Sequence, residues 1–467
     1  MNKRPLSLTL SIVALAGCTM IPKYQRPATP VTADWPGGPV YGKIDRNGSA
    51  ADISWRSFFT DPQLRKLIET ALQNNRDMRV AALNVELARD QYRIQRAALC
   101  PTVGPEASGI RGRTAAGVNG TTAPLLGNQY NVDYAAAAYE LDLFGKLRSL
   151  TRQQQEKYLA SAEARTSVQI SLISQVAIGY LTLHEIDEQL AVARQTLEAV
   201  RDSFRLNKRS FEAGTASELD LSTADAQVQT AQVHVLEFER QSALAVNSLT
   251  LLVGQPLPAD MPRGRSQPGQ TVVANLPAGL PSDLLLRRPD ILESEHILKA
   301  ANADIGAARA AFFPTIALTS SVGGSSLQLS KLFSKSAATW AFAPEISLPI
   351  FDCGKNLAGL DAANVSKRIE IANYEKSIQT AFREVADALA GKASYEQQVG
   401  AQESLVAAEQ KRYTLANARY RQGVDNYLNV LSAQQDLYSA QQALIQSRFA
   451  RLSSLITLYK ALGGGWK

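Results

Sequence analysis

The sequence is poor in the residues that build disulfide frameworks and metal sites. Its 467 residues include three cysteines and three histidines. So few cysteines exclude a disulfide framework in an exported chain of this size. His184, His234 and His296 share no metal-ligand spacing, and the sequence has no P-loop, HExxH or CxxC motif. We therefore expect no catalytic residue, no metal and no cofactor, and interpret the chain as something other than an enzyme.

Long apolar runs are also missing. No unbroken run of 18 apolar residues follows position 18, so the sequence does not predict a membrane-spanning helix. A chain of this kind can cross a membrane only as a closed β-barrel, because in lipid only helices and barrels satisfy every backbone group. The net charge of +6 is spread along the chain, which gives nucleic-acid binding little support.

The N-terminus has the pattern of a bacterial lipoprotein leader. Lys3 and Arg4 form a basic region, and a short apolar stretch follows over residues 6–16. The sequence Leu-Ala-Gly-Cys ending at Cys18 then matches a lipobox, so we expect cleavage before Cys18 and a covalent lipid on it. Thr19, in place of aspartate, favours the outer membrane. The alternative is an ordinary secretory signal followed by an incidental cysteine.

The chain repeats itself once. Residues 96–102 match residues 309–315 at an offset of 213, and Gly145-Lys146 matches Gly354-Lys355 at 209. A third match, also at 209, relates Phe211, Gly214, Leu219 and Ala224 to Tyr420, Gly423, Leu428 and Ala433. Solenoid repeats run about 20–45 residues, so this longer period indicates an internal duplication.

The duplication predicts the domain organisation. It comprises a signal peptide (1–17), a lipidated N-terminal segment (18–60), a first repeat (61–255), a connecting equatorial segment (256–281), a second repeat (282–462) and a C-terminal tail (463–467). The connection is rich in proline and glycine, but it also holds apolar residues such as Val272 and Leu276. We therefore expect it to be ordered.

Each repeat predicts a helix, two strands and a long helical hairpin. Period-2 alternation of apolar and polar residues is the pattern of barrel strands, with one face to lipid and one to the lumen. The first strand alternates poorly and is placed by analogy with its repeat. The expected helices cover 61–99, 146–212, 282–312 and 355–422, and the expected strands lie at 102–113, 139–143, 315–322 and 339–350, with Gly- and Ser-rich loops over 117–127 and 323–336.

The helices over 146–212 and 355–422 are far longer than those of globular domains. The first has no proline and, at 1.5 Å per residue, would extend about 100 Å, a length typical of coiled coils or repeats. Gly214 and Gly423 end the two helices, and each chain turns back into another helix. Small or apolar residues from Leu221 to Leu252 recur there at spacings of three and four, which predicts a heptad seam.

Barrel closure then predicts the assembly. Two strands per repeat give four per chain, whereas bacterial barrels start at eight strands. Several chains must share one barrel, and three chains give twelve strands, which can leave a pore. The sequence thus predicts an α+β membrane protein, with a trimeric 12-stranded β-barrel continued by a long α-helical barrel.

These motifs resemble those of the outer-membrane factor (TolC-like) family of efflux channels, in its NodT-type lipoprotein branch. The resemblance covers essentially the whole mature chain. It rests on residues 22–27 (Pro-Lys-Tyr-Gln-Arg-Pro), 55–62, 279–291 (including Arg-Arg-Pro-Asp), 348–355 and 461–466. It implies a homotrimer with an equatorial domain, lipid-anchored in the outer membrane of a Gram-negative bacterium and extending into the periplasm.

The resemblance also implies a function. A channel of this family is the passive exit duct of a tripartite (RND-type) efflux pump for drugs or other small toxic compounds. Its partners are a periplasmic adaptor (membrane fusion) protein and an inner-membrane transporter. Two alternatives stay open, which are a type I protein-secretion channel and a coiled-coil lipoprotein without a channel.

The hairpin tips are the candidate partner site. In the family the tips contact the adaptor, and here Gly214, Thr215, Gly423 and Val424 occupy them. A glycine at each turn also permits a positive φ. The alternative to adaptor contact is therefore a purely conformational role for both glycines.

The candidate gate lies beside the tips. Relatives commonly carry acids on the second arm, where Asn429 and Ser432 are neutral in this chain. The nearby acids are Asp220 and Asp425, and we expect them to form the constriction, with Phe211 and Tyr420 as steric stops. Alternatively, both aspartates only cap the helices that begin after the turns.

Overall fold

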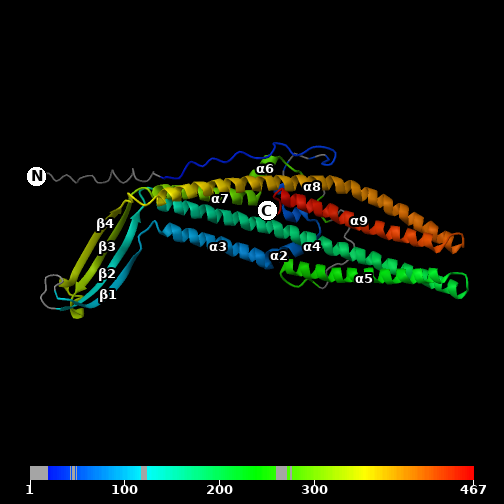
Figure 1. The fold of residues 1–467 in the computed structure, drawn as a ribbon, viewed down its shortest axis with the longest axis horizontal. Helices are drawn as coiled ribbons and strands as arrows, with labels where there is room; N and C mark the ends of the chain where they lie inside the picture. The colour runs from blue at the N-terminus through cyan, green and yellow to red at the C-terminus, as the bar shows by residue number, and fades with distance from the viewer. Residues whose placement is uncertain are drawn as a thin grey trace. The chain divides into compact units, whose positions relative to one another are not determined.

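The computed structural model describes residues 19–42, 44, 48, 50–116, 124–258, 271–273 and 276–466. Figure 1 shows a mostly helical chain with one small sheet. The chain divides into two compact units. The first contains residues 1–27, 85–161 and 294–374, and the second contains residues 28–84, 162–293 and 375–467.

The elements follow the predicted order of helices and strands. They are η2 (Ala50–Asp52), α1 (Trp55–Phe58), α2 (Pro62–Asn74), α3 (Arg76–Ala97), β1 (Val103–Thr114), β2 (Leu125–Leu141), α4 (Lys146–Glu212), α5 (Glu218–Val253), α6 (Pro281–Arg287), α7 (Pro289–Ala310), β3 (Thr315–Ser326), η4 (Leu329–Lys331), η5 (Lys335–Ala337), β4 (Ala338–Ser347), α8 (Lys355–Arg421) and α9 (Tyr427–Ala461).

The first unit holds a four-stranded antiparallel sheet in the order β1-β2-β3-β4 (Figure 1). Within the described residues, β1 and β4 each pair on one side only. A register shift between Ala136 and Tyr139 interrupts the pairing of β2 with β3. The sheet of a single chain therefore ends in two open edges.

The register separates an apolar face from a polar face, because residues directly opposite each other in an antiparallel pair lie on the same side of the sheet. Trp340 is opposite Val322, Val322 is opposite Tyr134, and Tyr134 is opposite Pro105. The apolar face also carries Val103, Ala107, Val132, Ile316, Leu318, Phe342 and Ile346. Trp340 is 79% exposed and Phe342 is 61% exposed in the single chain. An apolar surface of this extent requires a partner or lipid to cover it.

The opposite face is polar. Asn131 lies at its centre, where its Nδ2 donates to Ser108 Oγ at 3.2 Å and its Oδ1 accepts from Ser325 Oγ at 2.7 Å. These bonds join β1, β2 and β3 across one face. The remaining side chains of this face include Glu106, Gln129, Asp133, Thr319, Ser321, Thr339 and Glu345.

The two long helices form within one residue of the predicted bounds. α4 covers Lys146–Glu212, and α8 covers Lys355–Arg421. Of the described helices, α4 alone holds an 18-residue window apolar enough to span a membrane, with a mean hydropathy of 1.3, and half of that window is buried inside the protein. Such burial is typical of a helix that packs in a core.

The predicted seam of α5 is buried in the second unit. Ala231, Val235 and Phe238 pack against residues of α4, including Leu190 and Leu197. Their spacing of three and four residues places them on one face of the helix. These residues of the predicted seam therefore lie on the packed face of α5.

Two predicted helices are each broken in two. The helix expected over 61–99 breaks at Asn75, whose Oδ1 accepts from Met78 N at 3.0 Å and whose Nδ2 donates to Leu252 O at 2.9 Å. The side chain thus competes with the helical backbone and starts a new helix. The helix expected over 282–312 breaks at Arg288, because the following Pro289 disfavours helical geometry there.

The strand limits also differ from the prediction. β3 continues through Gly323 to Ser326, and β2 begins at Leu125, so both Gly- and Ser-rich loops are shorter than expected. β4 ends at Ser347, which leaves Leu348 and Ile350 outside the strand. The added residues of β3 are small and lie on both faces of the sheet, and Ser325 on the polar face donates to Asn131.

Candidate functional site

The first hairpin tip is a tight Schellman turn between α4 and α5. Gly214 adopts φ 75°, a conformation that glycine takes without strain. Gly214 N donates to Phe211 O at 2.9 Å, and Thr215 N donates to Ser210 O at 2.8 Å. These two bonds satisfy carbonyls that the end of a helix leaves free.

The second tip, between α8 and α9, repeats this geometry. Gly423 adopts φ 72°. Gly423 N donates to Tyr420 O at 2.9 Å, and Val424 N donates to Arg419 O at 3.0 Å. Val424 itself is 58% exposed. Both tips therefore present a hydrogen-bonded turn with an exposed residue after the glycine.

Asp220 takes part in the cap of α5. Ser217 Oγ donates to its carboxylate at 2.7 Å, and Ser217 N donates to the same oxygen at 3.3 Å. Asp220 N in turn donates to Ser217 Oγ at 3.1 Å, which completes a capping box. In the single chain, the carboxylate thus has the local partners that a capping role requires.

Asp425 lies beside the second tip and is paired with Arg419. Arg419 Nε donates to its carboxylate at 2.5 Å. This hydrogen bond from the guanidinium lowers the pKa of Asp425 below its ordinary value. Asn426, not Asp425, caps α9, through a bond from Asn429 N at 3.2 Å.

The two aromatic residues predicted as steric stops have different surroundings. Phe211 is 40% exposed. Tyr420 donates from its hydroxyl to Asn207 Oδ1 at 3.0 Å, and its ring lies 5.6 Å from that of Tyr427. Tyr420 therefore connects the tip of one hairpin to the other, and Asn207, which is 1% exposed, is a partner that the sequence did not predict.

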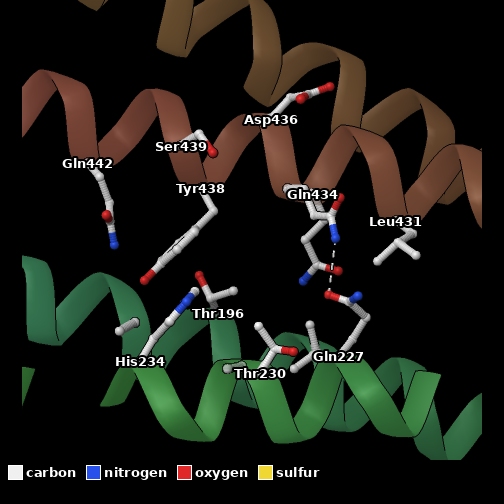
Figure 2. Close-up of a pocket in the computed structure, with 14 residues that line it drawn as sticks. Thr196, Gln227, Thr230, His234, Leu431, Gln434, Asp436, Tyr438, Ser439 and Gln442 are labelled. Carbon is white, nitrogen blue, oxygen red and sulfur yellow. Dashed lines mark hydrogen bonds between the residues drawn. The ribbon is translucent and has the colours of Figure 1, made fainter. Parts of the chain in front are cut away.

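A half-open cavity of about 500 Å³ lies between the two hairpins in the second unit. Figure 2 shows polar side chains from both hairpins directed into it. The ring of His234 stacks on that of Tyr438 at 5.5 Å, and Gln435 Nε2 donates to Gln227 Oε1 at 3.3 Å. The polar lining suits an aqueous surface. Across the described residues, no group of three or more His, Cys, Asp or Glu is arranged to hold a metal.

Comparison with known proteins identifies the family. The family model described as "Outer membrane efflux protein" matches residues 67–255 and 280–464. The chain belongs to the outer membrane efflux protein family.

Individual relatives of this family match over nearly the full chain. The sequence is 49% identical to a probable efflux pump outer membrane protein, TtgC, of Pseudomonas putida, covering 100% of this chain and 96% of that protein. It is 42% identical to outer membrane protein OprJ of Pseudomonas aeruginosa, covering 99% and 96%. The fold matches the open state of the Neisseria gonorrhoeae MtrE outer membrane channel with a TM-score of 0.86, 38% identity, and coverage of 96% and 99%.

Membership in the outer membrane efflux protein family confirms the family resemblance, the efflux function and the outer-membrane location expected from the sequence. The site residues at the tips stay predictions. Cys18 lies outside the described residues. Cys100 and Cys353 are both exposed and free.

The sequence reasoning missed two polar clusters built on family motifs. One surrounds Arg288 of the Arg-Arg-Pro-Asp segment, and the other surrounds Glu295 on α7. Each cluster includes a near partner in sequence, Asp290 or Lys299, but its other partners, such as Glu384 and Arg26, lie 96 and 269 residues away and have no local signal. The local sequence contains little signal, because Arg288 follows Arg287 and Glu295 lies between Ser294 and His296.

Proposed function

We propose that this chain forms the outer-membrane channel of a tripartite RND-type efflux pump, a passive exit duct for drugs or other small toxic compounds. The observation that carries the proposal is the four-stranded sheet with one apolar face, one polar face and two open edges. A sheet of this kind is suited to lipid on one side and water on the other. Two relatives, each 49% identical, are named as outer membrane proteins of an antibiotic efflux pump and a toluene efflux pump, and these names support the substrate class.

The open edges support a homotrimer. Four strands cannot close a barrel, so β4 of one chain pairs with β1 of the next, and three chains give a 12-stranded barrel. The long helices that adjoin these strands continue the barrel as an α-helical tunnel with an equatorial domain. The shared geometry of the two tips, 209 residues apart, supports an internal duplication.

The remaining parts of the proposal concern anchoring and partners. The signal peptide (1–17) is removed and Cys18 carries a covalent lipid, with no other cofactor. The hairpin tips bind a periplasmic adaptor, which connects the channel to an inner-membrane transporter. The channel has no enzymatic activity, because cargo passes through it unchanged.

A pair of matched substitutions on β4 tests the channel. Phe342 lies on the apolar face and Ala341 on the polar face. Phe342→Arg places a charge against lipid, which costs about 2–4 kcal/mol near the bilayer midplane, so we expect fewer heat-modifiable trimers in the membrane fraction. Ala341→Arg should leave the trimer level unchanged and alter ion selectivity in planar bilayers.

Equal trimer levels for both variants, with no conductance from the wild-type protein, would exclude the channel and favour a coiled-coil lipoprotein. Restoration of drug resistance in a strain that lacks its own efflux channel supports the small-molecule function. Restoration of protein secretion alone would favour a type I secretion channel.

A further inference from the structure

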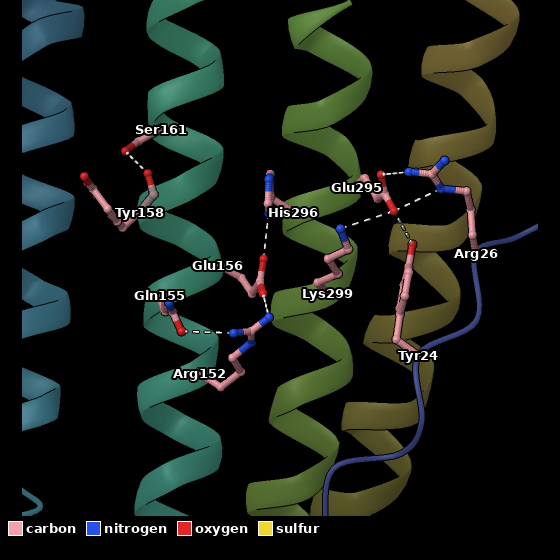
Figure 3. Close-up of polar contacts among 10 residues, drawn as sticks. All are labelled: Tyr24, Arg26, Arg152, Gln155, Glu156, Tyr158, Ser161, Glu295, His296 and Lys299. Carbon is pink, nitrogen blue, oxygen red and sulfur yellow. Dashed lines mark hydrogen bonds and ion pairs between the residues drawn. The ribbon is translucent and has the colours of Figure 1, made fainter. Parts of the chain in front are cut away.

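Residues 20–26, here called the N-terminal strap, include most of the Pro-Lys-Tyr-Gln-Arg-Pro motif that marks the family resemblance. The strap lies along α7 within the first unit (Figure 3). Arg26 Nη2 donates to Glu295 Oε2 at 2.5 Å, and Arg26 Nε donates to Oε1 at 3.1 Å. Tyr24 adds a bond from its hydroxyl to Oε1 at 3.1 Å.

Glu295 depends on these partners. Its side chain is 4% exposed, and a buried carboxylate is strongly destabilising unless it is paired. Lys299 Nζ lies 3.3 Å from Glu295 Oε1 and 5.5 Å from the ring centroid of Tyr24. Burial raises the pKa of Glu295, but the hydrogen bond from Arg26 and the charge of Lys299 outweigh it, so the pKa lies below its ordinary value.

The contacts continue along one face of α7. Asn302 Nδ2 donates to Pro22 O at 2.8 Å, and Arg309 Nη1 lies 3.4 Å from Met20 O. Between them, Gly306 leaves room for Ile21, since a Cβ there would lie 2.6 Å from Ile21 Cγ1. The five helix positions are Glu295, Lys299, Asn302, Gly306 and Arg309.

The spacing of these positions alternates between four and three residues, which places them in one row on the helix. Two of the contacts bind backbone carbonyl groups of the strap, and one contact depends on a missing side chain. Contacts of this kind constrain the path of the strap backbone more than they constrain which side chains the strap carries. We define these five residues of α7 as the strap track.

The strap has a fixed direction on this track. From Arg26 back to Met20, the contacts move from Glu295 toward Arg309 near the C-terminal end of α7. α7 ends at Ala310, and β3 begins at Thr315. Met20, the first residue of the strap, therefore lies beside the C-terminal end of α7, two residues after Cys18 in the sequence.

We propose that the strap track is a docking surface that positions the acylated N-terminus at the base of the sheet, so that lipid anchor and strands meet the membrane at the same level. This inference rests on the acylation of Cys18 included in the proposed function. The strap then acts as a spacer of fixed length between acyl chains and sheet, and its undocking frees the anchor from the strands.

A second buried glutamate on the neighbouring helix provides the matched control. Glu156 of α4 has a 1% exposed side chain, and it pairs with Arg152 at 2.6 Å and with His296 Nδ1 at 2.6 Å. Figure 3 shows both clusters, and the partners of Glu156, Arg152 and His296, belong to α4 and α7 rather than to the strap. Glu156→Gln and Glu295→Gln therefore each remove the charge of one buried carboxylate. Of these two carboxylates, that of Glu295 contacts the strap.

Limited proteolysis of the full-length protein in detergent tests docking. Trypsin can cut the strap after Lys23, whereas Arg26 precedes Pro27 and resists cleavage. We expect Glu295→Gln to accelerate release of the acylated peptide at least roughly tenfold, the factor that follows from losing about 1.4 kcal/mol of docking. Arg26→Leu should do the same from the strap side without disturbing the helices.

Glu156→Gln should leave the rate of cleavage at Lys23 unchanged. Equal acceleration by Glu156→Gln and Glu295→Gln, or no acceleration by Glu295→Gln and Arg26→Leu, would overturn docking on the strap track.

A double-mutant comparison tests positioning. We expect Glu295→Gln to slow trimer assembly in the acylated protein, and to have no further effect when Cys18→Ser, with a standard cleavable signal, removes the lipid. If Glu295→Gln slows assembly equally in the acylated protein and in the Cys18→Ser protein, the strap stabilises the fold without positioning the anchor. Failure of the proposed channel is distinguishable, because wild-type protein would then form no trimers in membranes at all.

Discussion

The guanidinium of Arg288 lies 2.8 Å from the carboxylate of Glu384, which joins the break between α6 and α7 to α8. Arg288 also donates to Asp290 at 2.5 Å and to Ala461 O at 2.9 Å. Its side chain is 8% exposed. The Arg-Arg-Pro-Asp segment therefore connects the end of α9 to the start of α7 through one buried cation.

Arg288→Ala should be destabilising, because it removes charged hydrogen bonds to Asp290 and Glu384, whose side chains are 37% and 39% exposed, and leaves Ala461 O without its donor. We expect a loss of about 1.5–3 kcal/mol, measured by thermal unfolding in detergent. Arg287→Ala is the control from the same motif, since Arg287 pairs with Asp52 at an exposed site. Its cost should stay below about 1 kcal/mol, and similar costs for both variants would contradict this assignment.

Glu185 should make stability depend on pH. Burial raises its pKa to about 7, above the value of an unfolded chain, so the folded state holds the proton more tightly. Its stabilising contribution is complete below about pH 4 and is lost as the pH rises through 7. Glu185→Gln should flatten this dependence and raise stability at pH 8 by about 1 kcal/mol, after allowance for partial exposure. An unchanged pH profile of the thermal midpoint would contradict the shift.

The tips should bind the adaptor through exposed residues. Val424→Asp changes the surface and leaves the backbone of the turn intact, so we expect lower drug resistance at a normal trimer level. Thr215→Val tests the other tip and also removes a hydroxyl bond to Ser210 O of 2.9 Å. Gly423→Ala separates the conformational role of the glycine from adaptor contact, because a φ of 72° costs alanine about 1 kcal/mol of backbone strain. Unchanged resistance in both surface variants would exclude tip docking.

The gate prediction concerns Asp220 and Asp425. Around a threefold axis, three copies of an acid repel one another, which raises its pKa unless a cation intervenes. If these residues form the constriction, Asp220→Ala or Asp425→Ala changes conductance and its response to divalent cations in planar bilayers. A capping role predicts a lower thermal midpoint with unchanged conductance, most clearly for Asp220 because of its capping box with Ser217.

The lipid anchor should be separable from the channel. Each buried CH₂ group of an acyl chain contributes about 0.8 kcal/mol to membrane binding, but the barrel alone should hold the trimer in the membrane. Cys18→Ser with a standard cleavable signal should still insert and should assemble less efficiently. Membrane fractionation and heat-modifiable migration measure both quantities, and a soluble periplasmic monomer would contradict the barrel.

Local sequence signals predicted the long elements. α4 runs between Lys146 and Glu212 as expected, because the stretch has no proline and its single interior glycine, Gly179, does not break a packed helix. Period-2 alternation located β3 and β4 but ended the first too early. Pro289 disfavours helical geometry at Arg288, so the sequence also contains the signal for the break in the helix expected over 282–312.

Long-range partners could not be predicted in the same way. Asn75 breaks a helix because Leu252 O accepts from it, and Glu295 is compensated by Arg26, 269 residues away. At the tips, the sequence indicated the positive φ of both glycines but not the bond between Tyr420 and Asn207. The sequence does not mark which polar residue is buried, because Asn75 and Glu295 both have polar neighbours, and the partner of each depends on the tertiary fold.

The number of strands per chain has a consequence for how the proposed ring is oriented. β1 and β4 run in opposite directions because an even number of antiparallel strands separates the two edges. β4 of one protomer can therefore pair antiparallel with β1 of an identical neighbour that points the same way, and this head-to-tail contact repeats until rotation closes it. With an odd number of strands, the same junction would have to be parallel. An even number of strands thus lets all protomers of the proposed ring point the same way with antiparallel pairing at every junction.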